Sequence, residues 1–321
     1  MLHDEIRIVQ RIRKKTLREN RDNISRTKAY LNYYKKNEEV WWALLASMVS
    51  RNAGWNMTDL KSNWYKNMMT QTYSYTLFLT FERANWLIFS DAFPQLLIYE
   101  TSKKENVSLF HLLNYFGVSQ FMVNEWHFFW EFRNLERLCT ALIINEQHYI
   151  QKPVIEHPFF SKHVFRSLPY FIVEHLHFNT VIYPTYEGQL FGFSVQQFKK
   201  VDQRIELGKK LAWLLFKSEE SSQIHPFATQ VEPTGSRRDY EKFLRWGTAK
   251  RNPILRMVYS PLVHHKHIDQ DWFQSTQDVE RFFQKWEHPN REYILTEWYQ
   301  QKLAELYLAM KVEKIFMKTF G

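Results

Sequence analysis

Four consecutive polar residues near the middle of the chain could carry out acid–base chemistry. They are Asn145, Glu146, Gln147 and His148, and they follow a run of three aliphatic residues. Burial raises the pKa of a glutamate, and a glutamate that titrates near neutrality can work with a histidine as general acid or base. Glu146, His148 and Asn145 are therefore the candidate catalytic residues. The commoner alternative is a hydrogen-bonded lock between helices, or an exposed last helical turn.

The element that must position this cluster is predicted to be one helix from Gln120 to Lys152. Its sequence is apolar nearly all round at 128–130 and again at 142–144, which is typical of a helix that passes through the interior. Pro153 is expected to close it.

A second polar cluster lies between residues 41 and 64. An apolar helical run from Trp41 passes into polar residues and reaches Gly54, which predicts a helix, a tight turn at this glycine and a second helix capped by Asn56 or Thr58. The start of such a helix could bind an anion. The candidate anion-binding residues are Arg51, Asn52 and Asn56. The favoured alternative is a capped, packed corner, because Asp59 would place a negative charge in the first turn.

The net charge of +9 is concentrated in two basic islands. Residues 1–36 hold eleven Lys and Arg against four Asp and Glu, and residues 235–267 hold eight against two. Such islands could contact a polyanion, either nucleic acid or an anionic membrane surface. The favoured alternative is a solvated helix and a basic loop, since the first group spreads over more than one helical face. The candidate residues are Arg11, Lys14, Lys15, Arg18, Arg237, Arg238, Lys250 and Arg251.

Metal and cofactor signatures are weak or missing in the sequence. Residues 264–267 and 174–177 carry histidines, but they lack the helical H-E-x-x-H arrangement, so no metal site is predicted. There is no P-loop, no dinucleotide-binding glycine fingerprint and no G-x-S-x-G motif. No cofactor is expected.

Cysteine content and hydropathy indicate the compartment. The single cysteine, Cys139, excludes an intramolecular disulfide and fits a reducing environment. The N-terminus has no apolar segment of signal-peptide length, and the longest apolar stretch, 75–99, is interrupted by charged residues. We expect a cytoplasmic protein without a transmembrane segment.

Composition predicts a mainly α, multi-helix globular fold. Hydrophobic residues make up 45% of the 321 residues, aromatic residues 17%, and there are only 8 glycines, which favours long helices over turn-rich β-structure. The best strand signal spans 180–194, where Glu187-Gly188 separates two short apolar runs. This segment predicts a small β-hairpin or an extended flap.

Domain organisation follows from the same patterns. Residues 1–36 are predicted to be a basic helical arm at the periphery, and residues 37–321 a single helical domain. The segment 218–236 is the clearest loop and the candidate boundary within that domain. Pro94 should end or kink a helix, Gly117 and Gly208 should break helices, Thr276 should cap 277–286, and Asn290 should start a final helix to about Met317.

Three strings of the sequence resemble a known protein family. They are SRNAGWNMTDL at 50–60, INEQHYI at 144–150 and TGSRRDY at 234–240, and they are similar to a YppC-like family of uncharacterised Firmicutes proteins, a domain of unknown function. The first string is the specific one, and the resemblance spans most of the chain. It implies a bacterial, cytoplasmic protein, and it assigns no reaction and no catalytic residue.

Two functions are consistent with these patterns. The leading one is a binding or scaffolding protein that uses its basic islands to contact nucleic acid or another polyanion. The alternative is an enzyme whose site combines the 51–59 turn with the 145–148 cluster. Convergence of both polar clusters in one open pocket would favour the enzyme, whereas separate burial would favour binding.

Overall fold

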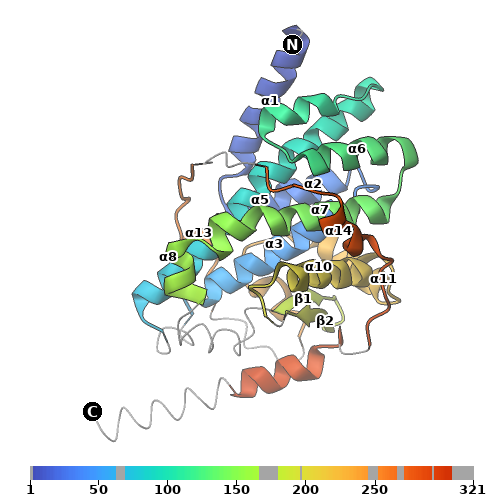
Figure 1. The fold of residues 1–321 in the computed structure, drawn as a ribbon. Coiled ribbons are helices and arrows are strands. Elements are labelled where there is room, and N and C mark those ends of the chain that lie inside the picture. The colour runs from blue at the N-terminus through green and yellow to red at the C-terminus, as the bar shows by residue number, and fades with distance from the viewer. Residues whose placement is uncertain are drawn as a thin grey trace, which may run out of the picture.

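Helix α3, Trp41–Asp59, is the central element of the fold (Figure 1). The computed structural model describes residues 3–62, 69–165, 180–195, 197–244, 252–265, 271–290 and 293–305. Within these, α3 packs against α2 (Asn23–Tyr34), α5 (Gln71–Glu105), α7 (Leu135–Ile150) and α10 (Val201–Phe216). Trp42 and Trp55, one near each end of α3, are fully buried.

The predicted turn at Gly54 is wrong, because α3 continues through this residue as regular helix. A Cβ atom at this position would lie 2.6 Å from Oδ1 of Asn23 in α2 and 3.2 Å from the Cα of Gly235. Gly54 therefore serves close packing of three segments. The predicted break at Gly208 is wrong for the same reason, since α10 is continuous and Gly208 packs on Ile143 of α7.

Helix α5 is the longest described helix, and Pro94 does not end it. The hydroxyl of Thr70 caps its first turn by accepting from the amide of Tyr73, and Asn106 ends it in the left-handed conformation with φ of 53°. Its buried residues extend along nearly the whole helix.

The predicted single helix from 120 to 152 is in fact two helices, α6 (Gln120–Phe132) and α7. Arg133 ends α6 in the left-handed conformation with φ of 52°. The side-chain oxygen of Asn134 then caps α7 by accepting from the backbone N–H of Arg137. Pro153 does not close α7 directly, because a π-helical turn, η2 (Gln151–Ile155), follows it. The break at Gly117 is confirmed: it separates η1 (Phe110–Phe116) from α6 and has φ of 67°.

The fold class is confirmed as mainly α with a small hairpin. Strand β1 (Thr180–Pro184) pairs antiparallel with β2 (Leu190–Ser194), with Thr180 opposite Ser194 and Tyr183 opposite Phe191. Two strands alone are marginally stable. Here β1 lies against α3 and α11 (Ser221–Gln230), and β2 lies against α10.

The segment predicted as a loop at 218–236 contains a helix, α11 (Ser221–Gln230). Its Ile224, Phe227 and Ala228 are fully buried in the same core as α3 and α7. The polar composition and Pro226 concealed this helix, although the spacing of the three apolar residues is helical.

Residues 3–36 contain two helices with different environments. Helix α1 (His3–Glu19) projects beyond the body at its first turns (Figure 1). Helix α2 belongs to the core, with Arg26, Tyr30 and Tyr33 buried. The expectation of a peripheral segment is therefore wrong for α2.

Shorter elements complete the described chain. They are α8 (Pro158–Phe160), η3 (Ser161–Phe165), α12 (Arg238–Glu241), α13 (Leu255–Val258), α14 (Gln277–Glu280) and η5 (Arg281–Phe283). The predicted helix at 277–286 is thus a short α-helix followed by a 3₁₀ turn. Of the predicted final helix, residues 296–305 are helical, and the part beyond 305 lies outside the described residues. In the part of the chain that is described, every helix is too short or too polar to cross a bilayer.

Replacing Gly54 by alanine should destabilise the fold. Helix propensity alone would stabilise the variant by up to about 1 kcal/mol, but the added Cβ overlaps Asn23, and overpacking typically costs about 1–3 kcal/mol. Urea unfolding of the wild type and of Gly54→Ala measures the balance. A more stable variant would show that the close approach of α2 does not constrain this position.

Candidate functional site

Asn145 lies in α7 with 1% of its surface exposed, and its amide joins three other segments. Its Nδ2 donates to Oδ2 of Asp91 in α5 at 2.7 Å, while its Oδ1 accepts from Oγ of Ser119 at 2.9 Å and from the indole of Trp272 at 3.0 Å. All these contacts link packed elements. The geometry is that of a hydrogen-bonded lock.

Glu146 and His148 point to different sides of α7, since residues two apart do not share a helix face. Burial raises the pKa of Glu146 to about 7, against the opposing effects of Gln147, Trp42 and Arg204. The His148 ring stacks on Trp272 with centroids 4.4 Å apart, and burial lowers its pKa. Arg204 acts electrostatically on both groups, but among the described residues no hydrogen bond or ion pair joins Glu146 to His148, so they are not arranged as an acid–base pair.

The three anion-binding candidates of α3 contact three different segments. Asn52 hydrogen-bonds the backbone of Ile182 in β1 in both directions, donating at 2.9 Å and accepting at 2.8 Å. Buried Arg51 donates to the carbonyl of Val231, and burial lowers its pKa. Asn56 accepts from Arg237 at 3.1 Å. These side chains therefore connect α3 to its neighbours and do not converge on one anion.

The end of α3 meets the 234–241 segment in a buried corner. Nε of Arg237 donates to Oδ2 of Asp59 at 2.7 Å, and its Nη1 donates to the hydroxyl of Tyr240 at 2.8 Å. Burial raises the pKa of Asp59, and the guanidinium opposes this shift. Trp55 donates to Asp239 at 3.0 Å in the same corner. Two of the three strings that carry the family resemblance, 50–60 and 234–240, are thus in direct contact.

The two polar clusters on which the enzyme interpretation depends lie at opposite ends of α3. Glu146 neighbours Trp42 at the helix start, whereas Asn56 and Asp59 are near its end. The 14 residues from Trp42 to Asn56 correspond to roughly 21 Å of helix.

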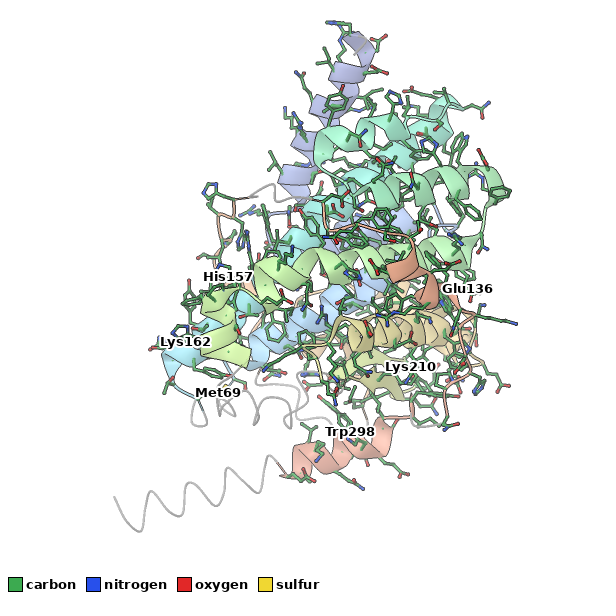
Figure 2. The ribbon with its side chains drawn as sticks, in the orientation of Figure 1. Met69, Glu136, His157, Lys162, Lys210 and Trp298 are labelled. Atoms are coloured by element: carbon green, nitrogen blue, oxygen red, sulfur yellow. The ribbon has the colours of Figure 1, made fainter. Side chains whose placement is uncertain are left out.

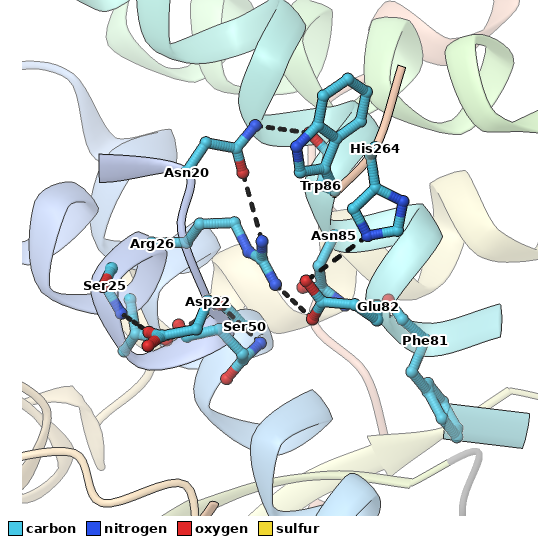
Figure 3. Close-up of polar contacts among 12 residues, drawn as sticks. Asn20, Asp22, Ser25, Arg26, Ser50, Phe81, Glu82, Asn85, Trp86 and His264 are labelled. Carbon is cyan, nitrogen blue, oxygen red and sulfur yellow. Dashed lines mark hydrogen bonds and ion pairs between the residues drawn. The ribbon is translucent and has the colours of Figure 1, made fainter. Parts of the chain in front are cut away.

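A buried ion pair that the sequence patterns did not reveal links α2 to α5 (Figure 3). Nη2 of Arg26 donates to Oε2 of Glu82 at 2.5 Å, and only 1% and 5% of these side chains are exposed. Nη1 of Arg26 donates to Asn20 at 3.2 Å, and His264 lies 3.7 Å from the same carboxylate. Helical spacing could not reveal this pair because its members are 56 residues apart.

Four basic residues form a single exposed stripe on α1. Arg7, Arg11, Lys14 and Arg18 are spaced by four, three and four residues, and all are exposed. This spacing places them on one helix face, opposite the buried Val9 and Ile12. We call these four residues the basic stripe. Lys15, predicted with this group, lies to one side, and Arg7 had not been singled out.

The candidates of the second basic island are dispersed. Arg237 is held by Asp59 inside the molecule, Arg238 is exposed, and Lys250 and Arg251 lie outside the described residues. A further arginine of this island, Arg256, pairs with Asp22 at 2.9 Å. That contact places residues 254–258 beside the turn between α1 and α2.

No group of three or more His, Cys, Asp or Glu side chains within the described ranges has the geometry to hold a metal ion. Of the metal-capable histidines, His264 lies beside Glu82 and Trp86 and His265 is exposed. The histidines at 175, 177 and 267 lie outside the described ranges.

Comparison with known proteins identifies the family. The chain belongs to the family described as "Protein of unknown function (DUF2515)", which matches residues 18–300. It is 47% identical over 314 residues to the "Uncharacterized protein YppC" of Bacillus subtilis (strain 168), and the match covers 97% of each chain. The resemblance carried by the three sequence strings is therefore confirmed. No solved structure matches the chain.

Breaking the buried ion pair should strongly destabilise the protein. Glu82→Ala leaves Arg26 charged and buried, a change that typically costs about 3–5 kcal/mol. The exposed pair Arg281–Asp202 provides the control, and Asp202→Ala should cost at most about 1 kcal/mol. Both values come from urea unfolding. Equal losses for the two variants would contradict the structural role of the buried pair.

The carboxyl of Glu146 should make stability depend on pH. Because its pKa rises from 4.5 to about 7 on folding, the folded state binds the proton more tightly, and this contribution is lost as pH rises from about 4.5 to 7. Glu146→Gln should remove it. The variant should therefore gain stability relative to wild type as pH rises through this window.

Unfolding of both proteins in urea at several pH values measures this difference. Burial also raises the pKa of Glu241 to about 7, but that residue is present in both proteins and its contribution cancels. A stability difference that is constant with pH would contradict the raised pKa of Glu146.

Proposed function

We propose that this protein is a cytoplasmic binding protein that contacts the phosphate backbone of nucleic acid through the basic stripe of α1. The observation that carries the proposal is the alignment of Arg7, Arg11, Lys14 and Arg18 on one exposed face. Arg11 and Lys14 have no ion-pair partner among the described residues. Unpaired cations on a projecting helix are available to neutralise phosphates.

The distribution of apolar residues on α1 favours nucleic acid over an anionic membrane. A helix that binds a membrane surface inserts an apolar face into the lipid. The apolar face of α1, with Val9 and Ile12, is already buried against the protein body. Leu17, which is 72% exposed, is left as an isolated apolar side chain. Electrostatic contact with phosphates needs no insertion.

The second basic island adds positive charge near one end of the stripe. Arg256 reaches Asp22 and Ser25, and Arg21 is exposed in the same turn. Half of the Arg256 side chain remains exposed. Arg21 and Arg256 therefore lie in and beside the turn that follows Arg18, the last residue of the stripe.

The geometry sets the expected strength of the electrostatic contact. From Arg7 to Arg18 the stripe covers 11 helical steps, or about 17 Å. Duplex DNA carries one phosphate charge per roughly 1.7 Å of its axis, so the stripe is long enough to contact several phosphates. Neutralising four phosphates of B-DNA predicts a slope of log K against log salt of about −3.6.

Charge reversal at Arg11 and Lys14 tests the proposal. Arg11→Glu/Lys14→Glu should weaken duplex binding at least ten-fold and reduce the magnitude of the salt slope by about 2, because two phosphate contacts are lost. Fluorescence anisotropy with a labelled duplex at several salt concentrations measures both. Thermal melting checks that the variant is folded.

The matched control reverses two exposed lysines far from α1, Lys162 and Lys210 (Figure 2). It makes the same change in net charge and should leave most of the affinity and the slope intact. Equal losses in the two variants, or binding by wild type that does not weaken with salt, would refute the proposed interface.

A further inference from the structure

A groove of about 260 Å³ lies at the end of the basic stripe, between α1, α2 and α5. Lys15 and Arg18 of α1 line it, together with Tyr33 of α2, Lys36 just beyond α2 and Glu100 of α5. Arg18 also belongs to the stripe, so the stripe leads directly into the groove. Helix α1 and the end of α2 thus bring cations to one concave site, and α5 brings the carboxylate of Glu100.

The charges in the groove are only partly compensated. Arg18 is paired with Glu19 at 2.8 Å. Lys15 and Lys36 have no carboxylate partner among the described residues, and the Lys15 ammonium lies 5.9 Å from the centre of the Phe93 ring. Two unpaired ammonium groups in one hollow favour an anion with more than one negative charge.

Tyr33 forms part of the groove wall and is 4% exposed. Its hydroxyl is buried and has no hydrogen-bond partner among the described residues, so it is shielded from an anion in the groove. Lys15 and Lys36 therefore supply the unpaired donors of this site.

We propose that this groove binds a phosphomonoester, specifically the terminal phosphate of a nucleic-acid strand whose backbone lies on the basic stripe. This inference rests on the proposed function and extends it. A terminal phosphate carries about −1.5 to −2 charge near neutral pH, whereas an internal phosphodiester carries one negative charge. Lys15 and Lys36 therefore favour the strand end over the strand interior.

Two carboxylates, Glu19 and Glu100, also line the groove. Glu19 is paired with Arg18 at 2.8 Å. Lys15 and Lys36 therefore outnumber the one remaining carboxylate, Glu100, and leave a net positive charge for the phosphate.

The test compares two duplexes of the same sequence, one with 5′-phosphates and one with 5′-hydroxyls. The wild type should bind the phosphorylated duplex about ten-fold more tightly, a difference of 1.4 kcal/mol. Lys15→Ala/Lys36→Ala should abolish this preference and retain binding to the hydroxyl duplex. Arg7→Ala/Arg11→Ala, which also removes two charges, should weaken both duplexes equally and keep the preference.

A titration with inorganic phosphate distinguishes free phosphate from the phosphate of a strand end as the ligand. Free phosphate should abolish the preference for the 5′-phosphorylated duplex only at concentrations well above those of the duplex. Equal affinity of wild type for both duplexes would overturn the groove inference and leave the proposed function intact. Failure to bind either duplex, with phosphate-induced shifts in the Lys36 amide resonance, would overturn the strand-end assignment and the proposed function together.

Discussion

The structure depends on pairing the polar side chains that α3 carries into the core. A buried donor or acceptor without a partner costs about 1–3 kcal/mol, so each such group fixes the segment that satisfies it. Asn52 fixes β1, Asp59 fixes Arg237, and Ser50 contacts Asn23 and Thr27 of α2. The hairpin, the 234–241 corner and α2 are therefore held to one helix by hydrogen bonds as well as by apolar packing.

Local sequence patterns predicted the type of secondary structure better than the positions of the helix breaks and the contacts between helices. Composition and periodicity gave the mainly α fold and the hairpin, because these depend on neighbouring residues. Gly54 and Gly208 were expected to break helices, and each instead admits a distant side chain, Asn23 or Ile143. A sequence does not show which distant residue will approach. The capping signal at Asn134 was local and could have separated α6 from α7.

The same distinction applies to the candidate sites. For the polar residues at 51–59 and 145–148 the sequence favoured a structural role. It could not identify their partners Asp91, Ile182 and Arg237, because these lie far away in sequence. The stripe on α1 depends only on helical spacing, but it was missed in the sequence because Arg7 was left out and the other basic residues were interpreted as spread over more than one face. Its charges have few internal partners, which separates the surface proposed for binding from the contacts that maintain the fold.

Hydrogen exchange of the protein with and without a duplex tests this separation most directly. The account predicts added protection confined to α1 and the turn that follows it, residues 3–22, while the amides of α3 stay equally protected in both states. Added protection at 51–59 and 234–241, with none in α1, would contradict it and would place the functional surface at the buried corner.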